Sequence, residues 1–235
     1  MATAASYAGF RYPVEIISHA VWLYFRFALS LRDVSELMLA RGVGVSHETV
    51  RQWTRKFGQD YANELRRRRP RPGDKWHLDE MVVRINGVQH YLWRAVDQDG
   101  VCLDVLVQRR RDARAAKKFF RKLLKGLRYT PRVLVTDKLG SYQVAQRETL
   151  SSVEHRRSKH LNNRAENSHQ PTRVRERAMK RFHSPGQAQR FCSAHGVICS
   201  HFRPGRHLMS GSEWRADMAE RFATWNEVTG VRAAA

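Results

Sequence analysis

The stretch VLVTDKLGSY, residues 133–142, decides the fold that we expect for this chain. Its first four residues, Val133 to Thr136, form an apolar run of the length and composition of a buried strand. Asp137 follows immediately, at the point where the chain must turn. A carboxylate at the end of an apolar strand, in a protein with a large excess of positive charge, calls for a chemical explanation.

The composition limits the classes of protein to which this chain can belong. Its 235 residues are 42% hydrophobic, enough for one catalytic-sized domain and a small accessory module. Lys and Arg number 43 against 22 Asp and Glu, a formal net charge of +21. Compact folding does not call for such a charge, so we expect a polyanionic partner. Nucleic acid is favoured over a membrane, because the longest apolar stretch, residues 20–31, is short and is interrupted by Arg26.

Two further features favour a cytoplasmic location. No secretory signal pattern opens the chain. Three cysteines are an odd number and too few for a disulfide framework, as expected for a protein of a reducing compartment.

The N-terminal segment shows helical periodicity. Apolar spacing predicts helices over residues 13–28, 31–40 and 47–57, the last with Ser46 as N-cap. The third helix has an apolar face and a polar, basic face. Three such helices resemble a helix-turn-helix, whose last helix enters the major groove, although an ordinary bundle with a solvated face fits the pattern equally. The net charge favours DNA binding, and the candidate DNA contacts are His47, Arg51, Gln52 and Arg55.

The run RRRRPRPGD, residues 66–74, combines charge and proline in a way that is typical of a linker. Its arginines either follow phosphates or form a solvated hinge, since both need the same composition. We therefore expect a helix-turn-helix domain over residues 1–65, a basic linker over 66–75, a larger second domain over 76–205, and a C-terminal helix and tail over 206–235.

Beyond the linker the hydrophobic period changes to two. WHLDEMVVRING, HYLWRAVDQDG and VCLDVLV predict three strands, joined at Asn86-Gly87 and Asp99-Gly100, which are strong hairpin signals. Asp112 is placed to cap an amphipathic helix over residues 113–127, and the strand of residues 133–136 follows. The order β-β-β-α-β followed by helices predicts an α/β fold, a mixed sheet flanked by helices.

Asp79 lies in the first of these strands and Asp137 ends the fourth. If the two strands are parallel neighbours, both carboxylates lie side by side at an open end of the sheet. Their mutual repulsion makes a divalent metal the economical explanation. Glu166 is the candidate third ligand, with His169 and Arg173 on the same face of its helix. Alternatively, Glu166 only neutralises nearby arginines on an exposed helix.

Four motifs occur in order along the chain: WHLDE with YLWRAVDQDG, LVTDKLGSY, and KHLNNRAENSH followed by RF. Together they resemble the DDE transposases of small bacterial insertion sequences, most closely the insertion-sequence-six-type family, whose members form cointegrates. The resemblance implies an N-terminal helix-turn-helix and a ribonuclease-H-like catalytic domain. It also implies that Asp79, Asp137 and Glu166 are catalytic metal ligands, with Arg173 as the basic residue seven positions after the glutamate.

The implied reaction is metal-assisted phosphoryl transfer. Two Mg²⁺ ions, for which Mn²⁺ can substitute, would support cutting at the 3′ ends of the element and attack of each 3′ hydroxyl on target DNA. The partners would be the terminal inverted repeats, the target duplex and further copies of the chain, with the bound protein associated with the nucleoid. The candidate phosphate contacts are Lys138, Arg164, His169 and Arg173.

Two other classes remain open: a catalytically decayed or regulatory DNA-binding protein, and a metal-dependent ribonuclease, which would give the helix-turn-helix no role. The chain also departs from the family in two places. Twenty-eight residues separate Asp137 from Glu166, fewer than is usual there. Pro171 removes a backbone donor and is expected to kink the helix before Arg173.

Two later segments carry weaker signals. A zinc site is conceivable in the segment of residues 192–201, which contains Cys192, His195, Cys199 and His201. Their spacing, however, is unlike that of zinc fingers or ribbons. We expect instead the core of a late helix, with partly exposed histidines.

The residues from Ser212 to Val228 place Trp214, Met218, Phe222 and Trp225 on one helical stripe, which packs on its own domain or forms a dimer contact.

Overall fold

The computed structural model describes residues 6–158, 160–205 and 208–231. The chain divides into two compact units. One unit runs from Pro70 to Gly196 and contains the sheet. The other combines the described residues before Pro70 with those from Val197 onward. The C-terminal segment therefore belongs to the N-terminal unit, whereas the sequence predicted a separate tail from residue 206.

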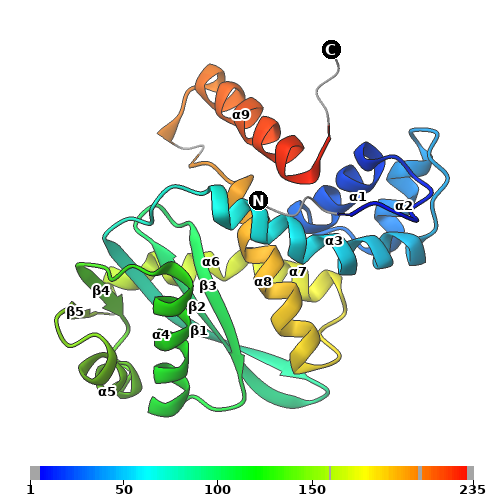
Figure 1. Ribbon diagram of the computed structural model, residues 1–235. Helices are drawn as coiled ribbons and strands as arrows, with labels where there is room; N and C mark the ends of the chain where they lie inside the picture. Colours follow the sequence, from blue (N-terminus) through cyan, green and yellow to red (C-terminus); the bar gives the residue numbers. More distant parts are fainter. Residues whose placement is uncertain (1–5, 159, 206–207, 232–235) are drawn as a thin grey trace. The chain divides into compact units, whose positions relative to one another are not determined.

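The larger unit is built on a five-stranded sheet of order β3-β2-β1-β4-β5 (Figure 1). Its strands are β1 (Lys75–Ile85), β2 (Val88–Asp97), β3 (Cys102–Gln108), β4 (Val133–Thr136) and β5 (Glu154–Arg157). β1, β2 and β3 are antiparallel, while β4 runs parallel to β1 and β5 parallel to β4. The predicted β-β-β-α-β order is confirmed, and β5 is an additional edge strand.

Local sequence explains the first hairpin. Asn86 and Gly87 have φ angles of 49° and 77°, the two positive values that a type I′ turn requires. Such a turn matches the twist of the strands on either side, so it sets the register of β1 against β2.

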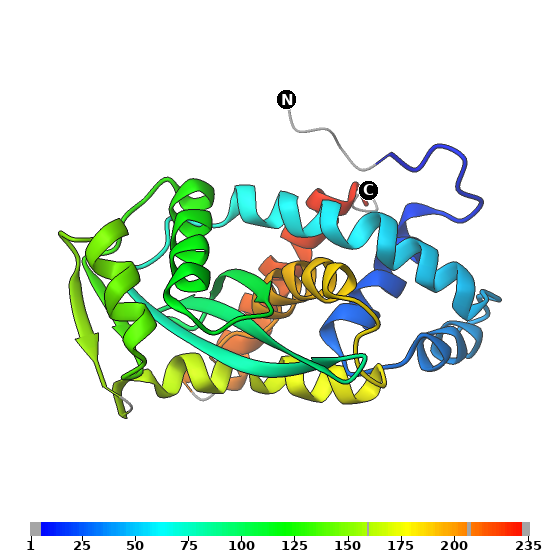
Figure 2. The ribbon, with the colours of Figure 1, turned by 90° about the horizontal axis from the view of Figure 1, so that it is seen from below.

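Helices cover both faces of the sheet (Figures 1 and 2). α4 (Ala113–Leu127) and α5 (Gly140–Thr149) pack on one face. The Asp112 carboxylate accepts a hydrogen bond from the amide of Ala115 at 2.9 Å, which confirms the predicted cap. The buried core between this face and its helices includes Trp76, Leu78, Trp93, Phe119, Phe120, Leu134 and Tyr142.

The opposite face carries α6 (Asn163–Ser168) and α7 (Gln170–Ala178), which follow the 3-10 turn His160–Asn162, and the first part of α8 (Pro185–His201). The Gln189 side chain of α8 donates to the carbonyl of Val105 at 3.1 Å. Side chains alternate across β2, so Trp93 enters the α4 and α5 core while Arg94 points toward α6 and α7.

The other unit contains α1 (Val14–Arg26), α2 (Leu31–Leu39), α3 (His47–Arg68) and α9 (Gly211–Thr229). Ser46 caps α3 as predicted, accepting from the amide of Thr49 at 3.1 Å. α3 is eleven residues longer than predicted, because its buried face continues through Tyr61, Ala62 and Leu65. The arginines that open the predicted linker therefore belong to the last turn of α3.

α9 completes this unit. Trp225 is buried and meets the ring of Tyr61 edge to face, with 5.2 Å between centroids. The Tyr7 hydroxyl donates to the carbonyl of Thr229 at 2.5 Å. Of the two alternatives for the stripe on this helix, packing on its own unit is the one observed, with Phe222 partly buried.

The cysteines of α8 are core residues. Phe191, Cys192, Val197 and Ile198 are buried as predicted. His195 is buried as well, contrary to the expected partial exposure, because its ring stacks on Phe191 at 5.2 Å. Among the described residues no cluster of cysteine and histidine forms a metal-ligand group.

None of the helices that the structure describes has the length and apolar character needed to cross a bilayer.

Candidate active site

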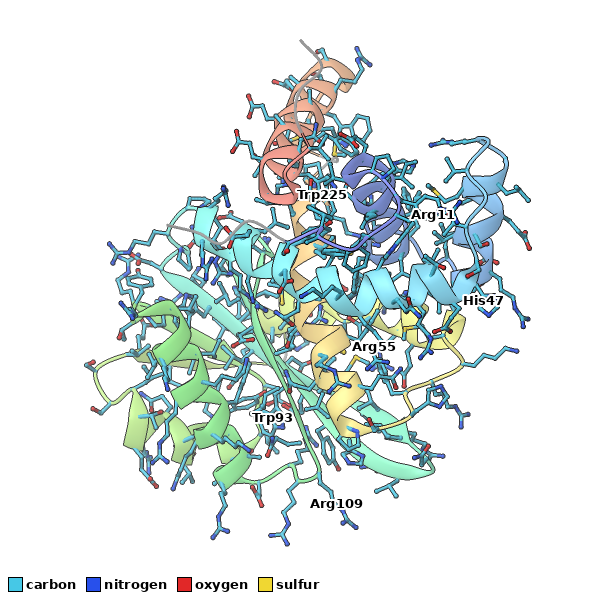
Figure 3. The ribbon with its side chains drawn as sticks, turned by 45° about the vertical axis from the view of Figure 1, so that its right-hand side comes forward. Arg11, His47, Arg55, Trp93, Arg109 and Trp225 are labelled. Atoms are coloured by element: carbon cyan, nitrogen blue, oxygen red, sulfur yellow. The ribbon has the colours of Figure 1, made fainter. Side chains whose placement is uncertain are left out.

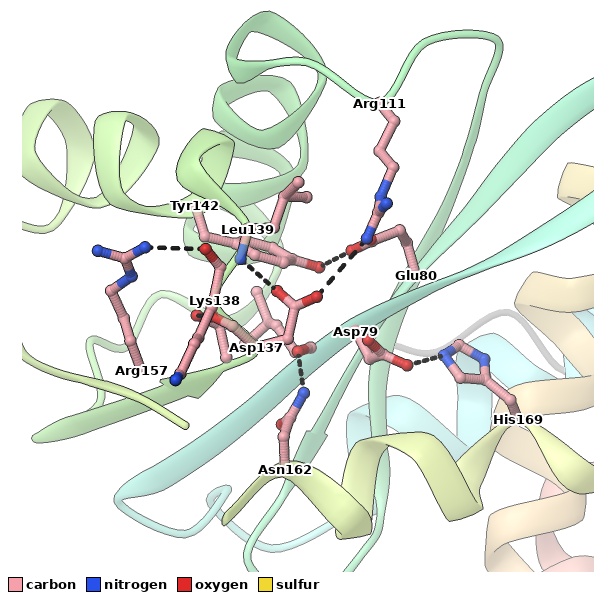
Figure 4. A network of polar contacts seen from close by, with 12 residues as sticks. Asp79, Glu80, Arg111, Asp137, Lys138, Leu139, Tyr142, Arg157, Asn162 and His169 are labelled. Atoms are coloured by element: carbon pink, nitrogen blue, oxygen red, sulfur yellow. Dashed lines mark hydrogen bonds and ion pairs between the residues drawn. The ribbon is translucent and has the colours of Figure 1, made fainter. Parts of the chain in front are cut away.

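The two aspartates singled out in the sequence meet where β4 ends beside the middle of β1. β1 and β4 are parallel, with Leu78 opposite Thr136. Asp79 and Asp137 are each the next residue, so the two carboxylates lie side by side at the point where β4 stops pairing with β1. With Glu80 they form a group whose ligand oxygens lie within 4.8 Å of one another (Figure 4). The expected juxtaposition of the two aspartates is confirmed.

Asp79 lies on the α6 and α7 side of β1. Its side chain is 15% exposed, and its Oδ2 atom is 3.3 Å from Nε2 of His169. Burial, reinforced by the like charge of Asp137, raises the pKa of Asp79 to about 6. The site therefore holds concentrated negative charge at neutral pH.

Asp137 is fixed by the turn that follows β4. Its Oδ1 atom accepts a hydrogen bond from the amide of Leu139 at 2.9 Å, and its Oδ2 atom is 3.6 Å from Nη2 of Arg111. This hydrogen bond, between residues two positions apart, holds the carboxylate beside Asp79.

Glu80 is a site residue that the sequence did not indicate. Strand alternation turns it to the α4 and α5 side, where Tyr142 donates to Oε2 at 2.6 Å and Arg111 to Oε1 at 2.5 Å. Burial raises the pKa of Glu80, although both donors oppose this rise. An acid directly after Asp79 was a visible signal, but nothing distinguished Arg111 among three consecutive arginines.

These carboxylates fit a divalent cation. Carboxylate oxygens are the hard ligands that Mg²⁺ and Mn²⁺ prefer. Burial and the charge of Asp137 raise the pKa of Asp79 more than Arg111 and Arg173 lower it, so a further cation between the two aspartates would be stabilising. Both Glu80 oxygens already accept hydrogen bonds, so Asp79 and Asp137 are the better placed ligands.

Glu166 lies in the first turn of α6, is exposed and is not one of the three grouped acids. α6 is held to the sheet at both ends. The buried Asn162 side chain donates to the carbonyl of Leu78 at 2.8 Å. Arg94, buried on β2, donates to the Ser168 carbonyl at 2.5 Å. The short helix that carries Glu166 is thus fixed next to the strand that carries Asp79.

The helical segment breaks at His169, which ends α6 and begins α7. Pro171 lies in the first turn of α7, so the expected kink before Arg173 is present. Glu166 and Arg173 consequently lie on separate helices. His169 is 2% exposed, and burial lowers its pKa well below the ordinary value. A buried, neutral imidazole does not fit the predicted phosphate contact.

The other predicted DNA contacts are exposed. Lys138, Arg164 and Arg173 are exposed, and Lys138 directly follows Asp137. On α3, His47, Arg51, Gln52 and Arg55 all face solvent, and His47 and Arg55 are marked in Figure 3. Arg51 forms an ion pair with Glu48 at 2.7 Å.

The sheet order and the paired carboxylates are those expected of a ribonuclease-H-like catalytic domain. A family model described as a DDE domain matches residues 73–204. Over 167 residues, the chain is 34% identical to the transposase for insertion sequence element IS257 in transposon Tn4003 of Staphylococcus aureus, covering 69% of this chain and 74% of that protein. The chain belongs to the DDE transposases of the insertion-sequence-six type, and it is an enzyme of that class.

Other similarities extend this comparison. The transposase for insertion sequence-like element IS431mec of Staphylococcus aureus is 33% identical over the same length. Among solved structures, the Mos1 transposase catalytic domain with Raltegravir and Mg aligns with a TM-score of 0.41 at 14% identity, over 76% of this chain and 96% of that one. The HTLV-2 integrase catalytic core with magnesium aligns with a TM-score of 0.35 at 16% identity, over 53% of this chain and 97% of that one.

Proposed function

We propose that this transposase cuts DNA at the 3′ ends of its insertion sequence and joins those ends to target DNA, by replicative, cointegrate-forming transposition. The observation that carries the proposal is the meeting of Asp79, in the middle of β1, with Asp137, directly after the end of the parallel strand β4. Glu166 is the third catalytic acid in this proposal. Terminal inverted repeats and target duplex are the substrates, and two element ends require at least two copies of the chain.

The residues of the chain would divide the work. Asp79, Asp137 and Glu166 would hold two divalent ions, Mg²⁺ or in its place Mn²⁺, which lower the pKa of the attacking water or hydroxyl and neutralise charge on the reacting phosphate. The turn at Leu139 orients Asp137, and the contacts of Asn162 and Arg94 fix α6 beside β1. Three exposed cations of this unit would bind DNA phosphates, and these are Lys138, Arg164 and Arg173.

The test is a DNA-joining assay with the full-length protein. Purified protein is incubated with Mg²⁺, a duplex carrying its own element end and a supercoiled target, beside an Asp137→Asn variant and a sample containing chelator. Joined product that disappears in both controls is the expected result.

The alternative is a decayed or regulatory DNA-binding protein. Specific binding of the element end without joined product, under conditions in which a related transposase joins its own ends, would favour that alternative. Joined product that persists in Asp137→Asn would reject the proposed metal site.

We also propose that α3 recognises the element end. Its exposed side chains include Gln52 and Arg55, types that pair with base edges in the major groove. Arg55→Ala is expected to weaken binding to the element end by about 10-fold and binding to a scrambled duplex much less, because a base contact carries sequence information. Fluorescence anisotropy with both duplexes measures this difference.

A matched control is Arg32→Ala, which removes one exposed positive charge from α2. We expect it to weaken binding to both duplexes by a similar factor. Equal losses on both duplexes for Arg55→Ala would show that Arg55 contributes only charge.

A further inference from the structure

Three side chains beside the aspartates have no role in the mechanism above. Glu80, Tyr142 and Arg111 form a connected group on the α4 and α5 side of the sheet (Figure 4). The Glu80 side chain is 1% exposed, and Tyr142 is completely buried against Trp93 and the stacked ring of Phe120. The anchor of this group is therefore held by core packing.

Arg111 is the outward-facing member of the group. Its Nε atom donates to Glu80, while Nη2 lies 3.6 Å from Asp137 Oδ2, which is longer than a hydrogen bond. Its side chain is 42% exposed. A guanidinium has five N–H donors in a planar fork, so donors remain at the end that faces Asp137 and solvent.

Arg94 differs from Arg111 in burial and in hydrogen-bond partners, and its role is structural. Arg94 is 4% exposed, and its two terminal nitrogens donate to Ser168 and Thr172. Arg94 joins two elements of the fold. The end of the Arg111 guanidinium instead points toward Asp137, where the two aspartates meet.

The charges around the two aspartates favour an anionic ligand for Arg111. A DNA phosphate that approaches the aspartates adds negative charge to a site already rich in carboxylates. Arginine binds phosphate with paired, charge-assisted hydrogen bonds, and a donor that is fixed in advance requires no reorganisation when the ligand arrives.

We propose that Arg111 is a phosphate-binding residue of the reaction centre, and that Glu80 and Tyr142 are positioning residues that hold its guanidinium there. The ligand is the DNA phosphodiester that reacts, and Arg111 stabilises its charge without transferring a proton. This inference rests on the proposed function, because it takes Asp79 and Asp137 as the reaction centre.

The test compares Arg111→Ala, Arg111→Lys and Tyr142→Phe with the wild type in three measurements. These are the single-turnover joining rate at saturating DNA, the dissociation constant for the element end, and calorimetric titration of the DNA-free protein with Mg²⁺. Arg111→Ala is expected to lower the rate by about 10²- to 10³-fold, as loss of one fixed donor to a charged transition state does.

The binding measurements separate this role from a structural one. Affinity for the element end should change by less than about 3-fold, because many other phosphate contacts contribute to it. Affinity for Mg²⁺ should increase, because a competing cation beside Asp137 is lost. Arg111→Lys should recover part of the rate, since an ammonium keeps the charge without the fork. Tyr142→Phe should lower the rate by about 3- to 10-fold, as it removes one hydrogen bond of the anchor.

Arg109→Ala is the matched control. Arg109 lies two residues earlier in the same loop, is exposed, and contacts no carboxylate among the described residues (Figure 3). Its replacement removes the same charge and should leave the rate at saturating DNA unchanged. An equal rate loss in Arg109→Ala would overturn the proposal, as would a wild-type rate in folded Arg111→Ala.

Two further results keep the test decisive. If Arg111→Ala does not fold, a wild-type rate in both Arg111→Lys and Tyr142→Phe would overturn the proposal. Asp137→Asn is measured in parallel. An inactive Asp137→Asn beside an active Arg111→Ala rejects the role of Arg111 alone, whereas an active Asp137→Asn rejects the proposed function itself.

Discussion

Asp79→Asn is expected to reduce the DNA-joining rate by at least about 10³-fold, because it removes one of the two carboxylates that meet where β4 ends beside β1. The amide keeps the size and shape of the side chain, so the fold and binding of the element end should be retained. Joining product quantified over time on gels measures the rate, and circular dichroism checks the fold. A rate within about 10-fold of the wild type would exclude Asp79 from the metal site.

The same substitution is expected to stabilise the metal-free protein. The pKa of Asp79 is about 6 in the folded protein, above its ordinary value of 3.8. Above pH 6 the folded state therefore carries a charge that its surroundings disfavour, at a cost on the order of 3 kcal/mol. Between these two pKa values the folded state binds a proton that the unfolded chain does not, so the cost shrinks as the pH falls toward 4.

Urea unfolding of wild type and Asp79→Asn, at about pH 7.5 and about pH 5, measures this effect as a difference in the free energy of unfolding. Comparing the two proteins at each pH cancels the contribution of buried histidines that do not touch Asp79, which changes in the opposite direction. The excess stability of the variant should be largest at the higher pH, and Mg²⁺ should reduce it by stabilising the wild type. A variant less stable than the wild type at the higher pH would contradict the prediction.

Glu166→Gln is expected to lower the joining rate by a similar factor, at least about 10³-fold, with a different effect on stability. Glu166 is exposed on α6. Its replacement should change the free energy of unfolding by less than about 0.5 kcal/mol, as is usual for surface positions. The joining assay and the urea titration described for Asp79 measure both quantities.

Glu154→Gln provides the control, since it removes an exposed acid from β5 of the same unit. It should leave the joining rate unchanged. If Glu166→Gln joins DNA as fast as this control, Glu166 is not the third acid, and Glu80 becomes the remaining candidate in the group.

Much of the fold could be predicted because its signals are local. Alternating side chains, the Asn86-Gly87 turn and the Asp112 cap each act within a few residues, and all were predicted from the sequence. β5 could not be predicted, because its residues Glu154–Arg157 are polar and charged and are ordered by hydrogen bonds to β4. The packing of Trp225 in the N-terminal unit depends on contacts far along the chain, for which no local pattern exists.

The candidate site also combines features that could be predicted from the sequence with features that depend on distant contacts. The pairing of Asp79 with Asp137 followed from the order of elements alone. The group around Glu80 did not, because it depends on the side chains of a loop and of α5, an element that was not predicted. His169 stands in a polar, basic segment and was therefore expected at the surface. It is buried because Arg94 fixes the junction of α6 and α7 against the sheet.

The position of α9 has a consequence for biosynthesis. α9 is the last described helix to leave the ribosome, yet it packs against α3, near the start of the chain. The residues of the sheet-containing unit are all synthesised earlier. Domains generally fold as their residues emerge. The nascent chain should therefore complete its catalytic unit first, and the N-terminal helices should reach their final packing only when translation passes Thr229.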